Sequence, residues 1–390
     1  MRIGFVVGGG FDRSGRDRVT PALLGLVERL ARGHDVHVFV LDYYPESCTY
    51  PLAGATVHDV GRVTGTPGLR RYRLRRRLGR AIDRVGPLDV LHAYMGVPSG
   101  IAAVFAGRAR GIPVVATFDS GELVAIDELS YGLQRRWIDR RAVGAVARIA
   151  SRVTVCTEYM WKQRTLGAAA ADIIPDIAPI GVDPRLFTSP PRIDGPPWRL
   201  LRVASINRVK DYPALLHAFR IVVDTLGADA GPVQLDVVGE DTLGGSVQAL
   251  SQTLGLDGRV AFHGVLPIDR VAAFYAHAHL HVSASRHEAA GVTTLEAACS
   301  GLATVGTAVG YVADWTANGA VGSERAVGVP IGNPAALADA IVALIRDPAR
   351  RSRIAASARA WAMRHDVDWT ARRFETIYRE VARPATAESR

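Results

Sequence analysis

The segment from His281 to Gly310 constrains the fold of this 390-residue chain more than any other. An alternating apolar run at residues 281–284 predicts the end of a buried strand. A loop that contains Glu288 follows, and a helix that stops at Gly301 leads into a second apolar run at residues 302–305. This order of strand, loop, helix and strand is typical of parallel α/β sheets, whose ligands bind beyond the carboxyl ends of the strands.

The start of that helix is a candidate anion-binding site, because helix N-termini offer unpaired N–H groups and a positive dipole end. Gly291, Val292 and Thr293 are placed to supply those groups. Glu288 and Glu296 lie on either side and would accept hydrogen bonds from hydroxyls. The pattern therefore indicates a ligand in which phosphate is joined to sugars. Two simpler interpretations stay open: Glu296 closes a capping box onto the Thr293 N–H, and Glu288 is a solvated loop residue.

The spacing Glu288-x7-Glu296, placed between strand and helix, resembles the E-x7-E motif of retaining glycosyltransferase family 4, the glycosyl transferases group 1. The resemblance implies the α/β GT-B fold, in which two Rossmann-like parallel-sheet domains face a central cleft. It also implies a nucleoside diphosphate-sugar donor, whose hexose Glu288 would hold and whose ribose Glu296 would hold. The chain departs from the family pattern at Ala289-Ala290, where an aromatic residue is usual, so the donor sugar stays open.

The loop at residues 205–211 follows another predicted strand and carries the second part of the resemblance. The family places an Arg and a Lys here, five residues apart, on the donor diphosphate. Lys210 matches the Lys, whereas Ser205 stands in the Arg position, so Arg208 is expected to supply the second charge. Such cations offset the charge on the departing diphosphate as a metal does elsewhere. A basic loop at a helix start is the simpler interpretation, although cations are disfavoured there unless an anion is bound.

Three further positions enter the predicted active site. Gly9 and Gly10 follow the first strand and Gly239 ends a later one, and all three are expected near the donor phosphates. The first glycine run does not spell G-x-G-x-x-G, which argues against a nicotinamide cofactor, and a plain turn is equally compatible. Asp119 follows the strand at residues 112–118, where relatives usually carry a His. It is a candidate acceptor-side base or hydroxyl acceptor, or simply the cap of the next helix.

Chain length and the alternation of strands and helices predict two domains. Four prolines at residues 190–197 predict an extended linker, so the N-terminal domain is expected at 1–187 and the C-terminal domain at 188–368. By resemblance, a last helix at 369–385 crosses back to the first domain. Predicted strands lie at 3–7, 36–41, 87–92, 112–118, 152–156, 200–204, 233–238, 259–263, 281–284 and 302–305.

The formal net charge of +9 suits anionic partners. Residues 69–85 read as a helix with one apolar face and eight arginines between Arg70 and Arg84. This helix either lies on an anionic membrane or is a solvated helix packed on its own sheet. Tyr72 is its one aromatic residue, which gives base stacking little support, so a nucleic-acid partner is not expected.

Three scattered cysteines form neither a disulfide framework nor a metal-ligand spacing, which favours a reducing cytoplasm and a metal-independent, cofactor-free enzyme. No apolar run approaches the roughly 20 residues that a membrane span needs. A cytoplasmic protein is therefore expected, with peripheral attachment at the inner face of the membrane left open.

The interpretation that these features favour is a retaining hexosyltransferase that moves a sugar from a nucleoside diphosphate-sugar to an acceptor hydroxyl. Lys210, Glu288 and Asp119 are its candidate catalytic residues. Alternatives are an epimerase or a phosphorylase of the same fold, or a non-catalytic protein that binds nucleotide-sugars. Base, sugar, acceptor and oligomeric state are not readable from the chain.

Overall fold

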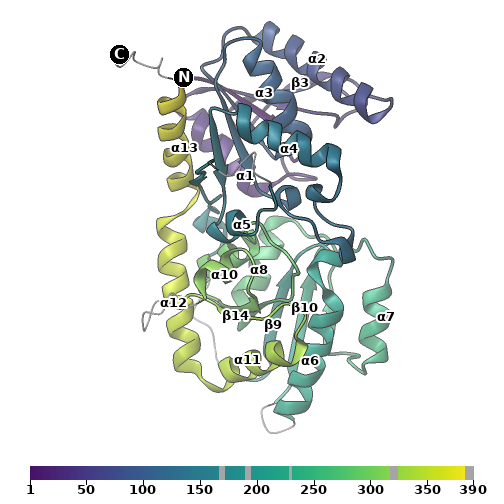
Figure 1. The fold of residues 1–390 in the computed structure, drawn as a ribbon. Coiled ribbons are helices and arrows are strands. Elements are labelled where there is room, and N and C mark those ends of the chain that lie inside the picture. The colour runs from purple at the N-terminus through teal and green to yellow at the C-terminus, as the bar shows by residue number, and fades with distance from the viewer. Residues whose placement is uncertain (167–171, 189–194, 228–230, 317–323, 383–390) are drawn as a thin grey trace. The chain divides into compact units, whose positions relative to one another are not determined.

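The computed structural model describes residues 1–166, 172–188, 195–227, 231–316 and 324–382. The chain divides into two compact units, Met1–Ile180 with Val367–Arg390, and Gly181–Asp366. Each unit is a predominantly parallel sheet with helices packed against it (Figure 1), so the expected α/β class with two Rossmann-like domains is confirmed.

The N-terminal unit holds a sheet with the strand order β3-β4-β2-β1-β5-β6-β7-β8, and only the β3–β4 pair is antiparallel among its described pairings. Its strands are β1 Arg2–Val7, β2 Asp35–Val40, β3 Cys48–Leu52, β4 Ala55–Asp59, β5 Val90–Tyr94, β6 Val114–Phe118, β7 Arg152–Val155 and β8 Asp176–Ile177. Its helices are α1 Pro21–Ala31, α2 Pro67–Val85, α3 Ile101–Arg108, α4 Trp137–Ile149, α5 Glu158–Lys162 and α13 Val367–Ala382.

The central strands are continuous apolar runs because helices cover both of their faces. In β1 the side chains of Ile3, Phe5 and Val6 are fully buried. The β3–β4 hairpin at the sheet edge was not among the predicted strands. Its turn at Ala53-Gly54 has positive φ at both residues, and Pro51 in β3 is tolerated because this strand lies at the edge.

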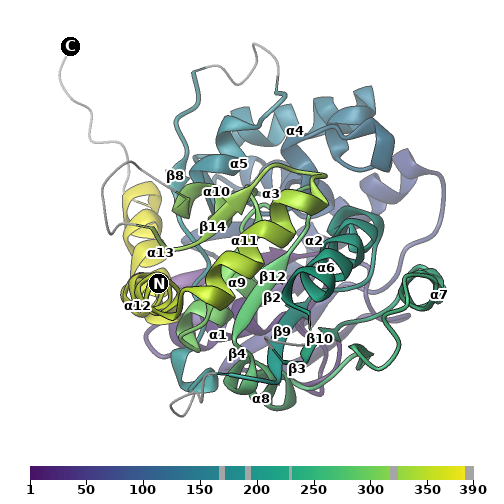
Figure 2. The ribbon, with the colours of Figure 1, turned by 90° about the horizontal axis from the view of Figure 1, so that it is seen from below.

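The C-terminal unit holds a parallel sheet with the order β11-β10-β9-β12-β13-β14. Its strands are β9 Trp198–Val203, β10 Val233–Val238, β11 Val260–Phe262, β12 Leu280–Ser283, β13 Ala303–Thr307 and β14 Val327–Val329. Its helices are α6 Tyr212–Leu226, α7 Ser246–Thr253, α8 Ile268–His277, α9 Val292–Cys299, α10 Tyr311–Trp315, α11 Pro334–Arg346 and α12 Pro348–Arg364. Helices α6 and α11 pack side by side in this unit (Figure 2).

The chain passes between the units at Ile180–Gly181 and again at Asp366–Val367. A Cβ atom on Gly181 would lie 2.4 Å from the Asp366 carbonyl oxygen, so only glycine lets the two connecting segments approach this closely. The boundary expected at residues 187–188 lies farther along the chain. Residues 189–194 of the proline-rich segment lie outside the described residues.

Helix α13 packs against α1 in the N-terminal unit, as the resemblance implied for the last helix. The Tyr378 hydroxyl of this helix lies 2.6 Å from His92 Nδ1 on β5, and His92 Nε2 lies 2.6 Å from Thr117 Oγ1 on β6. Burial lowers the pKa of His92 to about 3, so the ring is neutral and both nitrogens need partners. The end of the chain is thus fixed to the centre of the first sheet.

None of the described helices combines the length and the hydropathy that crossing a bilayer requires.

Tyr378→Phe removes the hydroxyl and leaves the buried His92 Nδ1 without this partner. We expect the free energy of unfolding to fall by about 1–3 kcal/mol, the usual cost of an unsatisfied buried polar atom. Urea unfolding measures it, with Tyr72→Phe as the control because the Tyr72 side chain is 48% exposed on α2. Equal losses for the two variants would contradict the anchoring role of Tyr378.

Candidate active site

The loop that carries Lys210 is shaped by two side-chain caps. Asn207 Oδ1 accepts hydrogen bonds from the N–H groups of Val209 and Lys210 at 3.0 and 3.2 Å, which forms a 3₁₀ turn at Arg208–Lys210. Asp211 then caps α6 through the Ala214 N–H at 3.3 Å. These caps fix the backbone of Lys210 at the carboxyl end of β9.

Lys210 and Glu288, which the sequence placed in separate motifs, meet in the structure. Lys210 Nζ lies 2.7 Å from Glu288 Oε1, and the Ser285 hydroxyl donates to the same oxygen at 2.8 Å. Burial alone would raise the pKa of Glu288, but Lys210 and then Arg202 outweigh it and lower the pKa to about 2. Glu288 is therefore a carboxylate at neutral pH and is not a solvated loop residue.

The second cation beside Glu288 is Arg202 of β9, which sequence reasoning missed. Its guanidinium lies 3.8 Å from Glu288 Oε1, and its side chain is 1% exposed. Arg208, the expected second charge, has an exposed side chain. The available signal for Arg202 was a charged residue inside an otherwise apolar strand, LLRV, where burial demands a partner.

Helix α9 begins at Val292, and its N-cap is Gly291, which has φ +82° and gives no side-chain cap. The left-handed φ is the reason that this position suits glycine. Glu296 accepts a hydrogen bond of 2.8 Å from the Tyr275 hydroxyl on α8. The capping-box interpretation, which needed Thr293 as the cap, is therefore wrong. Gly291, Val292 and Thr293 form the first turn, as the anion-site prediction required.

Burial raises the pKa of Glu296 to about 7, and the Tyr275 hydrogen bond opposes that rise only in part. The two glutamates of the motif therefore differ, because Glu288 is compensated by cations and Glu296 is not. A ligand hydroxyl that donates to Glu296 would favour its ionised form.

Gly239 ends β10 beside the Ser205 loop. A Cβ atom there would lie 2.1 Å from the Ala204 carbonyl oxygen and 2.9 Å from the Ser205 nitrogen, so the approach of the two backbones requires glycine. Ser205 Oγ in turn accepts from Asn207 Nδ2 at 2.9 Å. The structure thus brings Ser205 and Gly239 together at the carboxyl edge of the second sheet.

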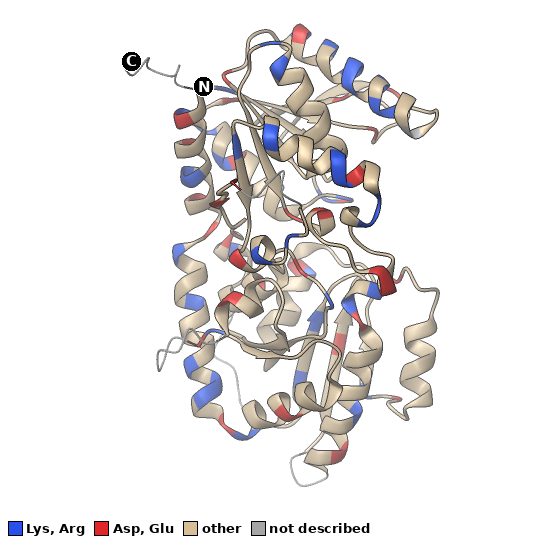
Figure 3. Ribbon diagram, in the orientation of Figure 1, with Lys and Arg blue, Asp and Glu red and all other residues tan. Residues whose placement is uncertain are grey.

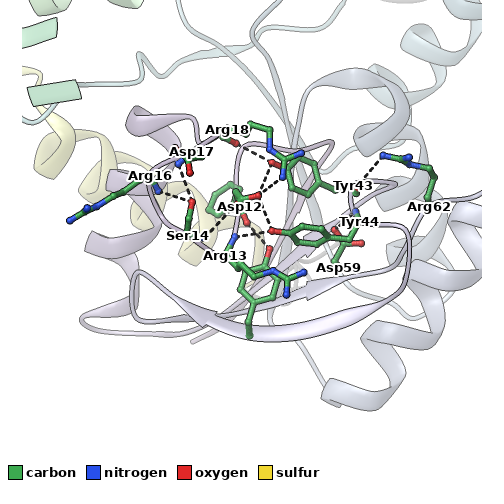
Figure 4. A network of polar contacts seen from close by, with 12 residues as sticks. Asp12, Arg13, Ser14, Arg16, Asp17, Arg18, Tyr43, Tyr44, Asp59 and Arg62 are labelled. Carbon is green, nitrogen blue, oxygen red and sulfur yellow. Dashed lines mark hydrogen bonds and ion pairs between the residues drawn. The ribbon is translucent and has the colours of Figure 1, made fainter. Parts of the chain in front are cut away.

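Gly9 and Gly10 lie at the carboxyl end of β1 in the N-terminal unit, next to a polar cluster centred on Asp12 (Figure 4). Asp12 is 6% exposed and accepts from Tyr44 Oη at 2.9 Å and from Arg18 Nη2 at 2.7 Å. Burial alone would raise its pKa, but hydrogen bonds from Ser14 and Tyr44 lower it to about 2. This cluster, which the sequence did not predict, holds the segment after the glycines in place.

Asp119 lies at the carboxyl end of β6 and is held from both sides. The Tyr94 hydroxyl donates to Asp119 Oδ2 at 2.7 Å, and the Cys156 thiol donates to Oδ1 at 2.9 Å. Burial, followed by the Asp119 charge, raises the pKa of Tyr94 and of Cys156 well above their ordinary values. Both groups therefore remain donors, and Asp119 is oriented as an acceptor.

Two family models match the chain. Residues 187–361 match the family described as glycosyl transferases group 1, and residues 19–176 match the glycosyl transferase 4-like domain. The chain belongs to the group 1 glycosyltransferases of family 4, with the GT-B fold. The family and enzyme class expected from the sequence are thereby confirmed.

This glycosyltransferase is 29% identical over 401 residues to the phosphatidyl-myo-inositol mannosyltransferase of Mycobacterium leprae, a match that covers 98% of this chain and 97% of that protein. It is also 29% identical over 318 residues to the D-inositol 3-phosphate glycosyltransferase of Xylanimonas cellulosilytica, covering 77% and 74% of the two chains. Among solved structures, its fold is similar to sucrose-phosphate synthase from Thermosynechococcus elongatus, with a TM-score of 0.77 and 18% identity over 97% and 99% of the chains.

Glu296→Gln is expected to change nucleotide binding by the glycosyltransferase in a pH-dependent way. With a pKa of about 7, Glu296 is about one-tenth ionised at pH 6 and nine-tenths at pH 8. If the carboxylate accepts a ribose hydroxyl, affinity for a nucleoside diphosphate rises about tenfold over this range and is flat in the variant. Calorimetry at the two pH values measures both.

The same substitution tests burial independently of binding. The raised pKa means that the folded state disfavours the carboxylate, so stability falls as pH rises from the ordinary 4.5 toward 7. Glu296→Gln lacks this penalty, and its thermal midpoint should exceed that of the native chain at pH 8 but not at pH 4. A constant difference at both pH values would contradict the account.

Proposed function

We propose that this glycosyltransferase transfers a sugar, with retention of anomeric configuration, from a nucleoside diphosphate-sugar to an acceptor hydroxyl. The observation that carries the proposal is the ion pair of Lys210 and Glu288 at the carboxyl edge of the second sheet. One partner comes from the loop after β9 and the other from the loop after β12. Cation and carboxylate are thus side by side where a phosphate and a hexose joined to it would need them.

In this proposal Lys210 contacts the diphosphate and offsets the charge that develops as it departs, without a metal ion. The N–H groups at the start of α9 bind the phosphates, since the helix dipole and the unpaired donors both favour an anion. Glu288 orients the hexose by accepting from its hydroxyls, and Glu296 accepts from the ribose. Ser205, Gly239 and Arg208 line the neighbouring loops.

On the acceptor side we assign Asp119 as the carboxylate that accepts the hydrogen bond of the attacking hydroxyl. Tyr94 and Cys156 support this role because they fix both of its oxygens from the protein side. The relatives named above act on phosphatidyl-myo-inositol and on D-inositol 3-phosphate, as their names state. A polyhydroxylated acceptor that carries a phosphate is therefore the first class to assay.

Lys210→Ala should lower kcat for sugar transfer by at least about 100-fold, the usual effect of removing one electrostatic contact in a transition state. The chain offers a matched control, since Lys162 is its only other lysine and its exposed ammonium pairs with Glu158 at 2.9 Å. Lys162→Ala should turn over normally. Transfer by native protein should also persist in excess EDTA. Unchanged turnover in Lys210→Ala, with donor, acceptor and product followed by chromatography, would overturn the assignment.

We further propose that the N-terminal unit contacts anionic lipid through α2, α3 and α4. The apolar face of α2 is used internally, because Leu74, Leu78 and Ile82 are at most 2% exposed. Lipid contact therefore falls to the outer face, where arginines line α2 (Figure 3) and exposed aromatic side chains interleave with them. Tyr72 on α2, Phe105 on α3 and Trp137 on α4 are 48%, 37% and 67% exposed.

These aromatic side chains are paired with cations. The Arg75 guanidinium lies 5.5 Å from the Phe105 ring centroid and 5.9 Å from that of Tyr72, and Arg141 lies 5.1 Å from Trp137. Arginines attract anionic headgroups at about 1 kcal/mol each, and amphipathic rings favour the interface. The combination supports a membrane surface more than it supports a plain solvated helix.

Replacing Arg76, Arg80 and Arg84 together by Gln should reduce cosedimentation with vesicles that contain an anionic lipid by at least about tenfold. Vesicles of zwitterionic lipid should bind neither protein. The control replaces three exposed arginines of α12, Arg353, Arg359 and Arg364, and so changes net charge equally. If both triple variants lose binding alike, the attraction is general charge and not this surface.

A further inference from the structure

Arg202 is a buried cation whose surroundings are built for it. Its Nη1 donates to Ser283 Oγ at 2.9 Å and its Nη2 donates to Ser285 Oγ at 2.7 Å, while Nη2 also faces Glu288 Oε1 at 3.8 Å. Ser285 bridges the two charges, because its own hydroxyl donates to Glu288. The Arg202 Nε has no hydrogen-bond partner among the described residues, so packing alone does not account for the choice of arginine.

One carboxylate oxygen of Glu288 therefore faces two cations of different character. Arg202 extends from inside β9 and is 1% exposed, whereas Lys210 sits on the following loop with 21% of its side chain exposed. The Lys ammonium is a compact charge on a flexible stem, and the Arg guanidinium is held by two fixed hydrogen bonds. Of the two, Lys210 is the one free to turn toward a ligand.

Turning Lys210 toward a diphosphate would remove the closest counter-charge of a buried carboxylate. Losing one partner of a buried ion pair is costly, and a lone buried carboxyl tends to take up a proton. A protonated Glu288 would be a poorer acceptor for sugar hydroxyls. A second cation that stays in place removes this conflict.

We propose that Arg202 is a positioning residue that keeps Glu288 in its carboxylate form while Lys210 leaves it to bind the donor diphosphate. The proposal rests on the proposed function for its diphosphate, but the charge relation itself is a property of the ligand-free protein. It assigns a reason to a charged residue in a central strand, at a position for which the E-x7-E resemblance offers no role.

Other groups around Glu288 do not titrate between pH 4 and pH 8. His281 of β12 is buried beside Arg202, and its pKa is lowered by burial to about 3. Tyr212 of α6 has its pKa raised by burial and donates to the Ala204 carbonyl at 2.7 Å. Lys210 and Arg202 themselves remain charged in this range. A change in the ionisation of Glu288 can therefore be read without interference.

The test titrates Glu288 in ligand-free protein that carries ¹³C at glutamate Cδ, with the signal assigned by its loss in Glu288→Gln. Lys210→Ala imitates the departure of the lysine. With Arg202 present, the Glu288 midpoint should stay below the ordinary value of about 4.3. In Lys210→Ala/Arg202→Gln it should rise above that value by at least about one pH unit. Glutamine keeps hydrogen-bonding capacity toward the serines, which favours folding, and melting curves verify it.

Arg202→Lys is the conservative variant and should restore the low midpoint in the Lys210→Ala background. A merely structural Arg202 would lower the melting temperature and leave the Glu288 midpoint unmoved in all variants, and that result would overturn the proposal. Should the Arg202→Gln variants fail to fold, comparing Lys210→Ala alone remains decisive, because a midpoint above 4.3 with Arg202 in place contradicts it.

The consequence for turnover is measured separately in Arg202→Gln with Lys210 intact. The acid side of its kcat profile should shift upward by about one pH unit, while affinity for the nucleoside diphosphate alone stays within about twofold of native. If native protein shows no transfer although Glu288 titrates as described, the proposed function fails and the charge relation stands.

Discussion

One carboxylate, Glu288, held between two cations of unequal freedom, is the interaction on which the rest of the site depends. Burial would neutralise it, and Lys210 and Arg202 prevent that. The neighbouring elements serve this arrangement. Strand β9 supplies both cations within a few residues of its end, and the β12 loop supplies the carboxylate and a bridging serine. Glu296, eight residues on, has a tyrosine partner instead of a cation and so keeps a titration near neutrality.

The parallel α/β order of the chain could be predicted because buried parallel strands are continuous apolar runs between helices with 3.6-residue periodicity. Strand β10 was predicted to the residue, and α9 and α13 within two residues. The E-x7-E spacing and Lys210 were recognisable because a catalytic site repeats residue types at fixed spacing. Their contact at 2.7 Å was not, since 78 residues separate them and only the sheet order β9-β12 makes their loops neighbours.

What the sequence did not reveal has physical reasons. The β3–β4 hairpin lacks the usual turn residues, because Ala53 occupies a position that favours Asn or Gly. Arg202 reads as noise inside an apolar strand until Ser283, Ser285 and Glu288 are seen around it. The capping box at Thr293 was a reasonable pattern, but Gly291 with a positive φ starts the helix earlier and frees Glu296 for Tyr275. The Asp12 cluster combines residues from two strand ends, which no local pattern joins.

The most direct measurement of the central claim is a crystal structure of the protein with a non-hydrolysable nucleoside diphosphate-sugar. The account predicts diphosphate oxygens within hydrogen-bond distance of Lys210 Nζ and of the α9 N-terminus, a hexose hydroxyl on Glu288, and Arg202 still bonded to Ser283 and Ser285. A donor whose diphosphate lies away from residues 205–211 and 288–296, with the Lys210–Glu288 pair undisturbed, would contradict it.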